Sequence, residues 1–393
     1  MKTVPRYVVF ELGKWFLISL TALTLIIVVF GVAQEAMKRS LPPGQVLLLI
    51  PYVLPDALRM AVPATLLLST ASVFGRLSSS NEITALKSLG ITPLALFTPL
   101  WVGAFLISLA TVWLNDIAAS WGREGVKQVV LDSVEEIAYG MLRSQRQYGN
   151  NRFSINVRDV QDRKLIKPIV VVQGKQSLTI SAEEAELVSD QEKSVFKVIL
   201  TNASIDFESK VAGRFPNTPY ELEIPLAEAT DIAPGRAPPS WLALAEIHRQ
   251  VPGQEERIRQ YEVQMAEIAA SRMIVGDIED LAGNEWETRA NALAGMKERL
   301  YRLKTEPHRR WSAGFSCLCF VWVGAPMAVW LRNRDFLTSF FLCFLPILVV
   351  YYPLLAFGID AAKSGTLPPS IVWLGNVLLV AWGFILLRKV IRY

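Results

Sequence analysis

Residues 15–33 read WFLISLTALTLIIVVFGVA, a run of 19 residues without a charged side chain. A bilayer core about 30 Å thick needs roughly 20 apolar residues of helix, so this run predicts a membrane span. Gly31 and Ala33 are small residues at plausible positions for signal cleavage before Gln34. The run is longer than the roughly 7 to 15 residues of a secretory signal core, which favours a retained helix.

Five further apolar segments predict spans of the same kind. They are Leu58–Phe74, Leu94–Leu114, Trp311–Leu331, Phe336–Ile359 and Ile371–Leu387. The first of these five is short and contains Arg59 and Pro63. Because Val46–Leu54 is also apolar, that helix can begin earlier, with bends at Pro51 and Pro55.

The composition agrees with a membrane protein. The chain is 52% hydrophobic and 19% charged, whereas soluble domains carry about 25% charged residues. A net charge of +4 is too small to predict a nucleic-acid partner. With two histidines and neither an HExxH motif nor a CxxC pair, the sequence predicts no zinc site, no histidine-based triad and no cofactor.

Basic residues beside the short loops predict the orientation of the spans. With a cytoplasmic N-terminus, the cytoplasmic side holds Lys2, Arg6, Lys14, Arg76, Lys87, Arg332, Arg334, Arg388, Lys389 and Arg392. The opposite short loops hold Lys38, Arg39 and Lys363, with Arg59 just inside the membrane. Because cytoplasmic loops carry the excess of Lys and Arg, this bias predicts both termini in the cytoplasm and residues 115–310 outside it.

Residues 115–239 predict an extracytoplasmic β domain. Short runs rich in β-branched residues are Phe153–Val157, Ile169–Gln173, Leu178–Ile180, Ala185–Val188, Val195–Leu200 and Ala203–Phe207. Turn-forming stretches separate them, which is typical of an antiparallel sheet. Polar and apolar residues alternate in Phe153–Val157 and Val195–Leu200, so each of these strands has one apolar face. Such faces fit a closed core and a lipid conduit equally well.

The pattern changes to helix between Trp241 and Lys304. Apolar residues recur at three- and four-residue spacing in two groups: Ile258, Tyr261, Met265, Ile268 and Val275, then Trp286, Leu293, Met296, Leu300 and Leu303. Gly276 and Gly283 lie between the groups, so residues 240–310 predict an antiparallel helical hairpin. A self-packed hairpin and a partner-binding arm both fit this pattern.

Together these segments predict an α+β membrane protein with six transmembrane helices. Residues 1–114 hold the first three helices and residues 311–393 hold the last three. Between them lie the β domain at 115–239 and the hairpin at 240–310.

The loop after the second span reads GRLSSSNEITALKSLGITP, residues 75–93. Ser79 and Glu82 have the spacing of a capping box, and Gly90 and Pro93 supply stop signals, so a short helix is expected over residues 79–90. Its apolar residues Ile83, Leu86 and Leu89 are three apart along one side. Such a helix lies on a membrane surface or docks into a partner groove, and its spacing fits both.

The run from Gly75 to Pro93 resembles the coupling-helix segment of the LptF/LptG permease family, which belongs to the lipopolysaccharide-export ABC transporter. Other similar stretches are Ile50–Pro55 with Val62-Pro63, Gly324-Ala325-Pro326, Leu367-Pro368-Pro369 with Trp373 and Asn376, and Leu178–Ala182 in the β region. Each motif is weak by itself, and their order along the chain makes the resemblance specific. The long helical insertion at 240–310 departs from the family pattern.

This resemblance implies one permease half in the inner membrane, of either the F-like or the G-like type. It implies a second LptF/LptG-type permease, a cytoplasmic LptB-like ATPase dimer and a periplasmic LptC/LptA-like bridge as partners. A β-jellyroll in the periplasm would pass lipopolysaccharide or a related lipid to that bridge. The chain has no GxxxxGK[ST] run, so it cannot supply the phosphate-binding loop for ATP hydrolysis; the energy must come from a partner, or transport must be passive. The resemblance implies a transport permease and not an enzyme, with ATP hydrolysis supplied by a separate ATPase subunit.

Two other functions compete with this interpretation. The first is a non-transporting membrane scaffold or sensor whose extracytoplasmic domain binds an envelope partner. The second is an intramembrane enzyme. Glu11, Asp56 and Asp360 lie near helix ends, where solvated carboxylates are ordinary, so the sequence disfavours the enzyme.

The resemblance assigns the coupling helix to residues 79–90. Glu82 and Lys87 are expected to make polar contacts to the ATPase, while Ile83, Leu86 and Leu89 fill its groove. A helix that simply lies on the membrane surface is the alternative.

Two further sets of residues are candidates for lipid contact. Lys38 and Arg39 lie just beyond the outer end of the first span, where the family has its lateral entrance, so they could bind headgroup phosphates. Simple snorkelling to the interface also explains them. Ile155 and Val198, on the apolar faces of two strands, are expected to line a lipid path through the β domain.

Overall fold

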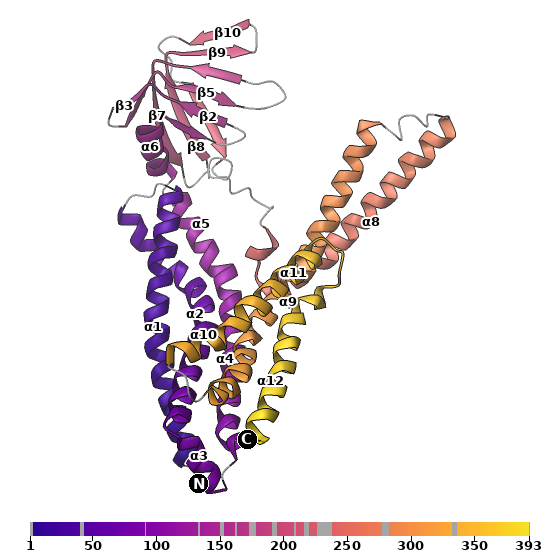
Figure 1. Ribbon diagram of the computed structural model, residues 1–393. Coiled ribbons are helices and arrows are strands. Elements are labelled where there is room, and N and C mark those ends of the chain that lie inside the picture. The colour runs from indigo at the N-terminus through magenta and orange to yellow at the C-terminus, as the bar shows by residue number, and fades with distance from the viewer. Residues whose placement is uncertain are drawn as a thin grey trace. The chain divides into compact units, whose positions relative to one another are not determined.

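The computed structural model describes residues 3–39, 43–90, 92–132, 134–149, 153–161, 163–172, 178–190, 195–207, 210–215, 220–225, 238–276, 283–331 and 336–392. The chain divides into two compact units. The helical unit comprises Met1–Ile27, Pro55–Ser120 and Pro239–Tyr393, and the β unit comprises Val28–Leu54 and Trp121–Pro238. Figure 1 labels many of their elements.

Helices account for most of the described chain. The α-helices are α1 (Thr3–Arg39), α2 (Pro43–Ser79), α3 (Glu82–Ser88), α4 (Pro93–Ile117), α5 (Arg123–Asp132), α6 (Val134–Gln145), α8 (Leu244–Val275), α9 (Asn284–Trp330), α10 (Phe336–Pro346), α11 (Tyr352–Lys363) and α12 (Leu374–Arg392). Short π-helical or 3-10 segments are η1 (Ala118–Gly122), η2 (Pro239–Trp241), η4 (Ile347–Tyr351) and η5 (Pro369–Trp373).

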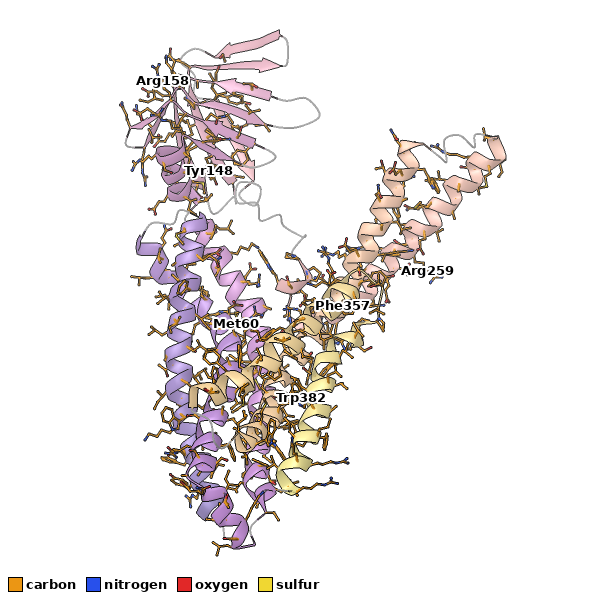
Figure 2. The ribbon with its side chains drawn as sticks, viewed as in Figure 1. Met60, Tyr148, Arg158, Arg259, Phe357 and Trp382 are labelled. Carbon is orange, nitrogen blue, oxygen red and sulfur yellow. The ribbon has the colours of Figure 1, made fainter. Side chains whose placement is uncertain are left out.

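Six helical stretches within the described residues are long and apolar enough to cross a membrane. They are Arg6–Met37, Gly44–Ser79, Leu94–Leu131, Asn284–Trp330, Phe340–Lys363 and Pro369–Arg392. Each overlaps one span expected from the sequence, and α2 begins early, at Pro43. Met60 and Phe357, labelled in Figure 2, are 60% and 57% exposed, as suits side chains that face hydrocarbon.

The helical unit is packed around α9. Gly314 of α9 lies against Val112 of α4, and Gly383 of α12 lies against Trp322 of α9. Small residues at these positions let the helix backbones approach closely, which favours van der Waals packing between membrane helices. Ser312 and Asn376 add buried polar contacts, since Asn376 Nδ2 donates to the Ser312 carbonyl oxygen at 2.9 Å.

Over residues 240–310, where a hairpin is expected, α8 and the first part of α9 pack side by side in antiparallel directions. Tyr261 Oη donates to the Arg289 carbonyl across the pair, and Lys297 Nζ lies 2.7 Å from Glu262 Oε1. Val275 was expected in the seam, but it is 80% exposed. Because α9 runs unbroken through 47 residues, the boundary expected at residue 310 falls inside one helix.

The described strands form two antiparallel sheets. Their bounds are β1 (Gln147–Gly149), β2 (Phe153–Asn156), β3 (Asp159–Gln161), β4 (Lys164–Ile166), β5 (Ile169–Val172), β6 (Leu178–Ser181), β7 (Glu184–Asp190), β8 (Val195–Thr201), β9 (Ala203–Phe207), β10 (Lys210–Phe215) and β11 (Tyr220–Pro225). One sheet has the order β1-β2-β5-β6-β9-β10, and the other has the order β11-β8-β7-β4-β3. Each of the six runs expected as strands overlaps a strand; Val157 follows the end of β2, and Gln173 lies outside the described residues.

Both sheets contribute to one apolar core. Ile155, Val170 and Ile180 from the first sheet join Leu165 and Val198 from the second in the same buried cluster. Helix α6 adds Leu142 and Ile137 to this cluster. The strands β1, β3 and β4 are three residues long, which is too short for an alternation pattern, so the sequence did not predict them.

The hydroxyl of Tyr139 joins α6 to the second sheet. Tyr139 Oη donates to the Arg163 carbonyl oxygen at 2.5 Å and accepts the Leu187 amide at 3.0 Å. We expect Tyr139→Phe to cost about 1–3 kcal/mol of unfolding free energy, because the buried Leu187 amide loses its acceptor. The measurements are thermal unfolding and hydrogen exchange at Leu187.

The same tyrosine predicts a pH dependence. Burial raises the pKa of Tyr139 above its usual value. A group whose pKa is raised on folding adds stability at low pH and loses it as the pH rises, so the deficit of Tyr139→Phe should hold up to pH about 9 and shrink above pH about 10. Tyr261→Phe, which removes a longer 3.4 Å bond on the hairpin, is the control and should cost less. A deficit equal for both variants would contradict this role of Tyr139.

Candidate functional site

The loop between α2 and α4 carries the short helix α3. It has seven residues, and its N-cap residue Asn81 has φ 59° with no side-chain cap. The expected capping box is wrong: Ser79 Oγ donates to the Arg76 carbonyl, while Glu82 Oε1 accepts from Ser80 Oγ at 2.9 Å. Ser79 cannot begin a new helix because α2 extends through it. The helix therefore begins at Glu82 instead of residue 79.

The apolar residues of α3 do not share one environment. Ile83 is 5% exposed and belongs to the core cluster of the helical unit, against which Leu86 also packs. Leu89 is 74% exposed. Of the three residues expected to fill a partner groove, only Leu89 is freely available in this structure.

The two charged residues of α3 also differ. Glu82 is exposed. Lys87 is half-buried, and its Nζ donates to the Val390 carbonyl oxygen at 2.8 Å. Lys87 therefore contacts the last helix of its own chain, whereas Glu82 remains open to a partner.

Other contacts tie the surroundings of α3 together. Arg76 Nη2 lies 3.2 Å from Glu11 Oε1, which joins α2 to α1. Ser78 Oγ donates to the Val329 carbonyl oxygen at 2.9 Å, which joins α2 to α9. The ends of α1, α2, α3, α9 and α12 thus meet around this loop.

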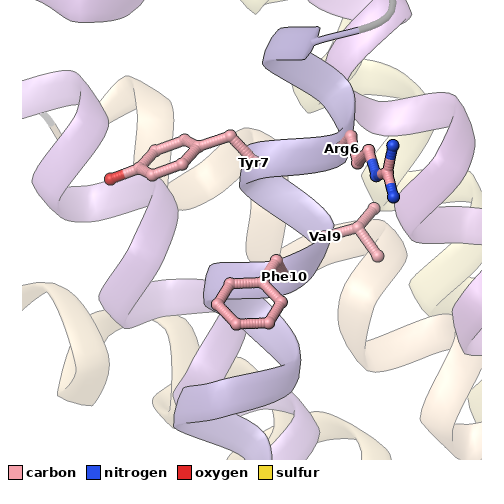
Figure 3. A pocket seen from close by; sticks show the side chains of 4 residues that line it. All are labelled: Arg6, Tyr7, Val9 and Phe10. Carbon is pink, nitrogen blue, oxygen red and sulfur yellow. The ribbon is translucent and has the colours of Figure 1, made fainter.

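A surface hollow of about 460 Å³ lies on the first turns of α1. Figure 3 shows its lining residues Arg6, Tyr7, Val9 and Phe10, all from this one helix. Tyr7 and Phe10 are 51% and 73% exposed. The hollow is open, so it is better described as a face of α1 than as an enclosed binding site.

The other sequence-predicted residues lie apart from this loop. Lys38 and Arg39 are the last residues of α1, and their side chains lie outside the part that the structure describes. Ile155 and Val198 both have 0% exposure and lie in the core of the β unit. Neither of the latter two lines an open path in this structure.

Sequence reasoning missed a buried charged cluster centred on Arg310, whose exposure is 1%. Its Nη1 donates to Asp116 Oδ1 and its Nη2 donates to the Leu242 carbonyl, each at 2.7 Å. Asp116 also accepts the Leu244 amide at 2.8 Å, at the first turn of α8. One guanidinium therefore joins α4, α9 and the start of the hairpin. The sequence signal was an Arg and an Asp at the ends of two expected spans.

Within the described ranges, no three His, Cys, Asp or Glu side chains lie close enough together to hold a metal ion. No curated protein matches the sequence. The family described as "Lipopolysaccharide export system permease LptF/LptG" matches residues 6–389, nearly the whole chain. The chain therefore belongs to the LptF/LptG family, and is a multi-pass inner-membrane component of lipopolysaccharide export and not an enzyme.

Proposed function

We propose that this chain is the permease subunit of an ABC transporter that extracts lipopolysaccharide or a related envelope lipid from the inner membrane. A separate cytoplasmic ATPase dimer, LptB-like, hydrolyses ATP. A second LptF/LptG-type permease completes the membrane unit, and a periplasmic LptC/LptA-like bridge receives the lipid. The observation that carries this proposal is the family match over residues 6–389, together with an exposed short helix between two spans.

The proposed topology places both termini in the cytoplasm. Three spans precede and three spans follow the two β-sheets, which lie in the periplasm and form a jellyroll. The bias of Lys and Arg among the short loops supports this orientation. Two antiparallel sheets over one shared core support the jellyroll assignment.

Helix α3 is the proposed coupling helix. Glu82 and Leu89 contact the ATPase, because both are exposed. Ile83 and Leu86 anchor the helix to the core of this chain, which revises the groove-filling role expected for them. A buried anchor keeps a seven-residue helix in place, since a helix this short is unstable alone.

Two sets of residues contact the lipid in this proposal. Lys38 and Arg39 bind headgroup phosphates at the outer end of α1, where charge-assisted hydrogen bonds to phosphate are strong. Ile155 and Val198 border the path of the acyl chains. Because both are fully buried, the two sheets must separate for lipid to pass between them.

Glu82→Lys tests the coupling helix and the transporter together. We expect roughly tenfold less ATPase retained by the purified permease, because the substitution reverses the charge of an exposed contact residue. Lipid-stimulated hydrolysis should fall with it, while membrane insertion is unchanged. The measurements are ATPase co-purification and hydrolysis with and without lipopolysaccharide.

Glu267→Lys, an exposed acid on α8, is the matched control and should leave ATPase retention unchanged. Unchanged retention in Glu82→Lys would remove the coupling role of α3. Absence of any associated ATPase from the wild-type chain would favour the scaffold or sensor.

A further inference from the structure

Lys87 makes a contact that the coupling-helix assignment does not use. Its Nζ donates to the Val390 carbonyl oxygen at 2.8 Å, a contact between residues 303 positions apart in the chain. Lys87 lies in the last turn of α3, and Val390 lies in the last turn of α12. The hydrogen bond thus joins the ends of two helices.

Elementary helix physics explains why this contact is stable. The last four carbonyl groups of an α-helix have no partner within the helix, and they form the negative end of its dipole. Val390 belongs to this last turn of α12, which ends at Arg392. The ammonium group of Lys87 satisfies one of these carbonyls and places a positive charge at the negative end of α12.

Neighbouring contacts join α12 to α9 at this end. Lys389 Nζ lies 4.3 Å from the centre of the Trp330 ring, which joins α12 to α9. Val390, Leu386 and Ile83 belong to one buried apolar cluster. Helix α3 therefore shares one apolar core with α12, and the hydrogen bond from Lys87 joins the two helices directly.

The three side chains of α3 have different surroundings. Leu89 is exposed, Ile83 is buried in the core, and Lys87 contacts α12. We propose that Lys87 is a positioning residue that transmits displacement of α3 to α12, and through Lys389 and Trp330 to α9. This inference rests on the proposed function, in which α3 contacts the ATPase, and it adds that the ATPase displaces α3 during its cycle. Glu82 and Leu89 then bind the ATPase, and Lys87 conveys the displacement of α3 to α12.

The experiment compares Lys87→Met with two truncations of the full transporter complex. Lys87→Met keeps much of the side-chain length but removes the donor and the charge. A chain ending at Lys389 lacks the Val390 carbonyl and also the buried Val390 side chain, whereas a chain ending at Val390 keeps this side chain and an oxygen acceptor and is the control for loss of the last three residues. Lys87→Arg restores the charge and the donor.

We expect Lys87→Met to retain the ATPase within about twofold of wild type and to release roughly fivefold less lipopolysaccharide per ATP hydrolysed. The chain ending at Lys389 should show at least the same loss, and the chain ending at Val390 and Lys87→Arg should show little. Because both changes remove the same bond, Lys87→Met in the chain ending at Lys389 should be no worse than the truncation alone. Amide exchange at residues 388–389 should be faster in Lys87→Met than in wild type.

Three results would overturn the inference. Loss of ATPase retention in Lys87→Met would make Lys87 an ATPase contact. Lipid release per ATP equal to wild type would show that the hydrogen bond from Lys87 transmits nothing. Additive losses in the combined variant would show that Lys87 and the end of α12 act separately. A wild-type complex without lipid-coupled hydrolysis would instead remove the proposed function, and the inference with it.

Discussion

Arg310→Met should destabilise the helical unit by about 3–5 kcal/mol, the usual cost of removing one partner from a buried ion pair. The substitution leaves the Leu242 carbonyl and Asp116 Oδ1 without the two donors that lie 2.7 Å from them. Glu306, 1% exposed, loses a nearby positive charge, because its Oε2 lies 3.8 Å from Arg310 Nε. Thermal unfolding of the purified chain and hydrogen exchange over residues 240–246 measure the effect.

The position of Arg310 along α9 adds to this expectation. Pro307 lies inside the same helix, about one turn before Arg310. A proline removes one backbone hydrogen bond and weakens the helix locally. The hydrogen bonds from Arg310 to α4 and to the start of the hairpin therefore stabilise a weakened part of α9. In Arg310→Met, we expect amide hydrogen exchange to increase most at the base of the hairpin.

Arg309→Met is the matched control for Arg310→Met. Arg309 pairs with the same Glu306 at 2.8 Å, but its side chain is 25% exposed. Because Glu306 is buried, the variant leaves its carboxylate without the two hydrogen bonds that Arg309 donates, and a loss of about 1–3 kcal/mol is expected, below that of Arg310→Met. Asp116→Asn should add little in the Arg310→Met background, because both groups share one bond. Equal losses for Arg309→Met and Arg310→Met would show that the contacts of Arg310 with α4 and the start of the hairpin add no stability of their own.

Gly314→Ala should loosen the packing of α9 against α4. A methyl group at Gly314 would lie 2.9 Å from the Val112 main-chain nitrogen, and it would also meet the Val112 side chain. A backbone atom cannot rotate away, so the two helices must separate. Overpacking of this kind costs about 1–3 kcal/mol, with correspondingly lower thermal stability.

Gly103→Ala provides the control within α4, because a methyl group there meets no atom within 4 Å. Alanine forms helices better than glycine, so this variant should have a thermal stability equal to or slightly above that of the wild type. If Gly314→Ala melts at the same temperature as Gly103→Ala, the close approach of α4 and α9 does not limit stability. A crosslink yield between cysteines placed on the two helices measures the separation directly.

Local patterns determined much of this fold. Long apolar runs predicted all six candidate spans, because a bilayer leaves a single apolar chain segment almost no alternative to a helix. Alternating residues predicted β2 and β8, and helical spacing predicted helices where α8 and the first part of α9 lie. Both periodicities arise from neighbouring residues along one element, so sequence alone carries them. The ordered motifs likewise predicted the LptF/LptG family.

The functional contacts depended on residues far apart in the chain. Lys87 reaches Val390 across 303 positions, and Arg310 reaches Asp116 across 194. Packing against distant parts of the chain likewise buries Ile83 and leaves Leu89 exposed, although their spacing placed both on one apolar side of the short helix. Spacing along a helix describes which residues share a face, but the packing of other helices decides which part of that face is covered. Tertiary structure therefore separated the residues of α3 that can meet a partner from those that hold it to its own chain.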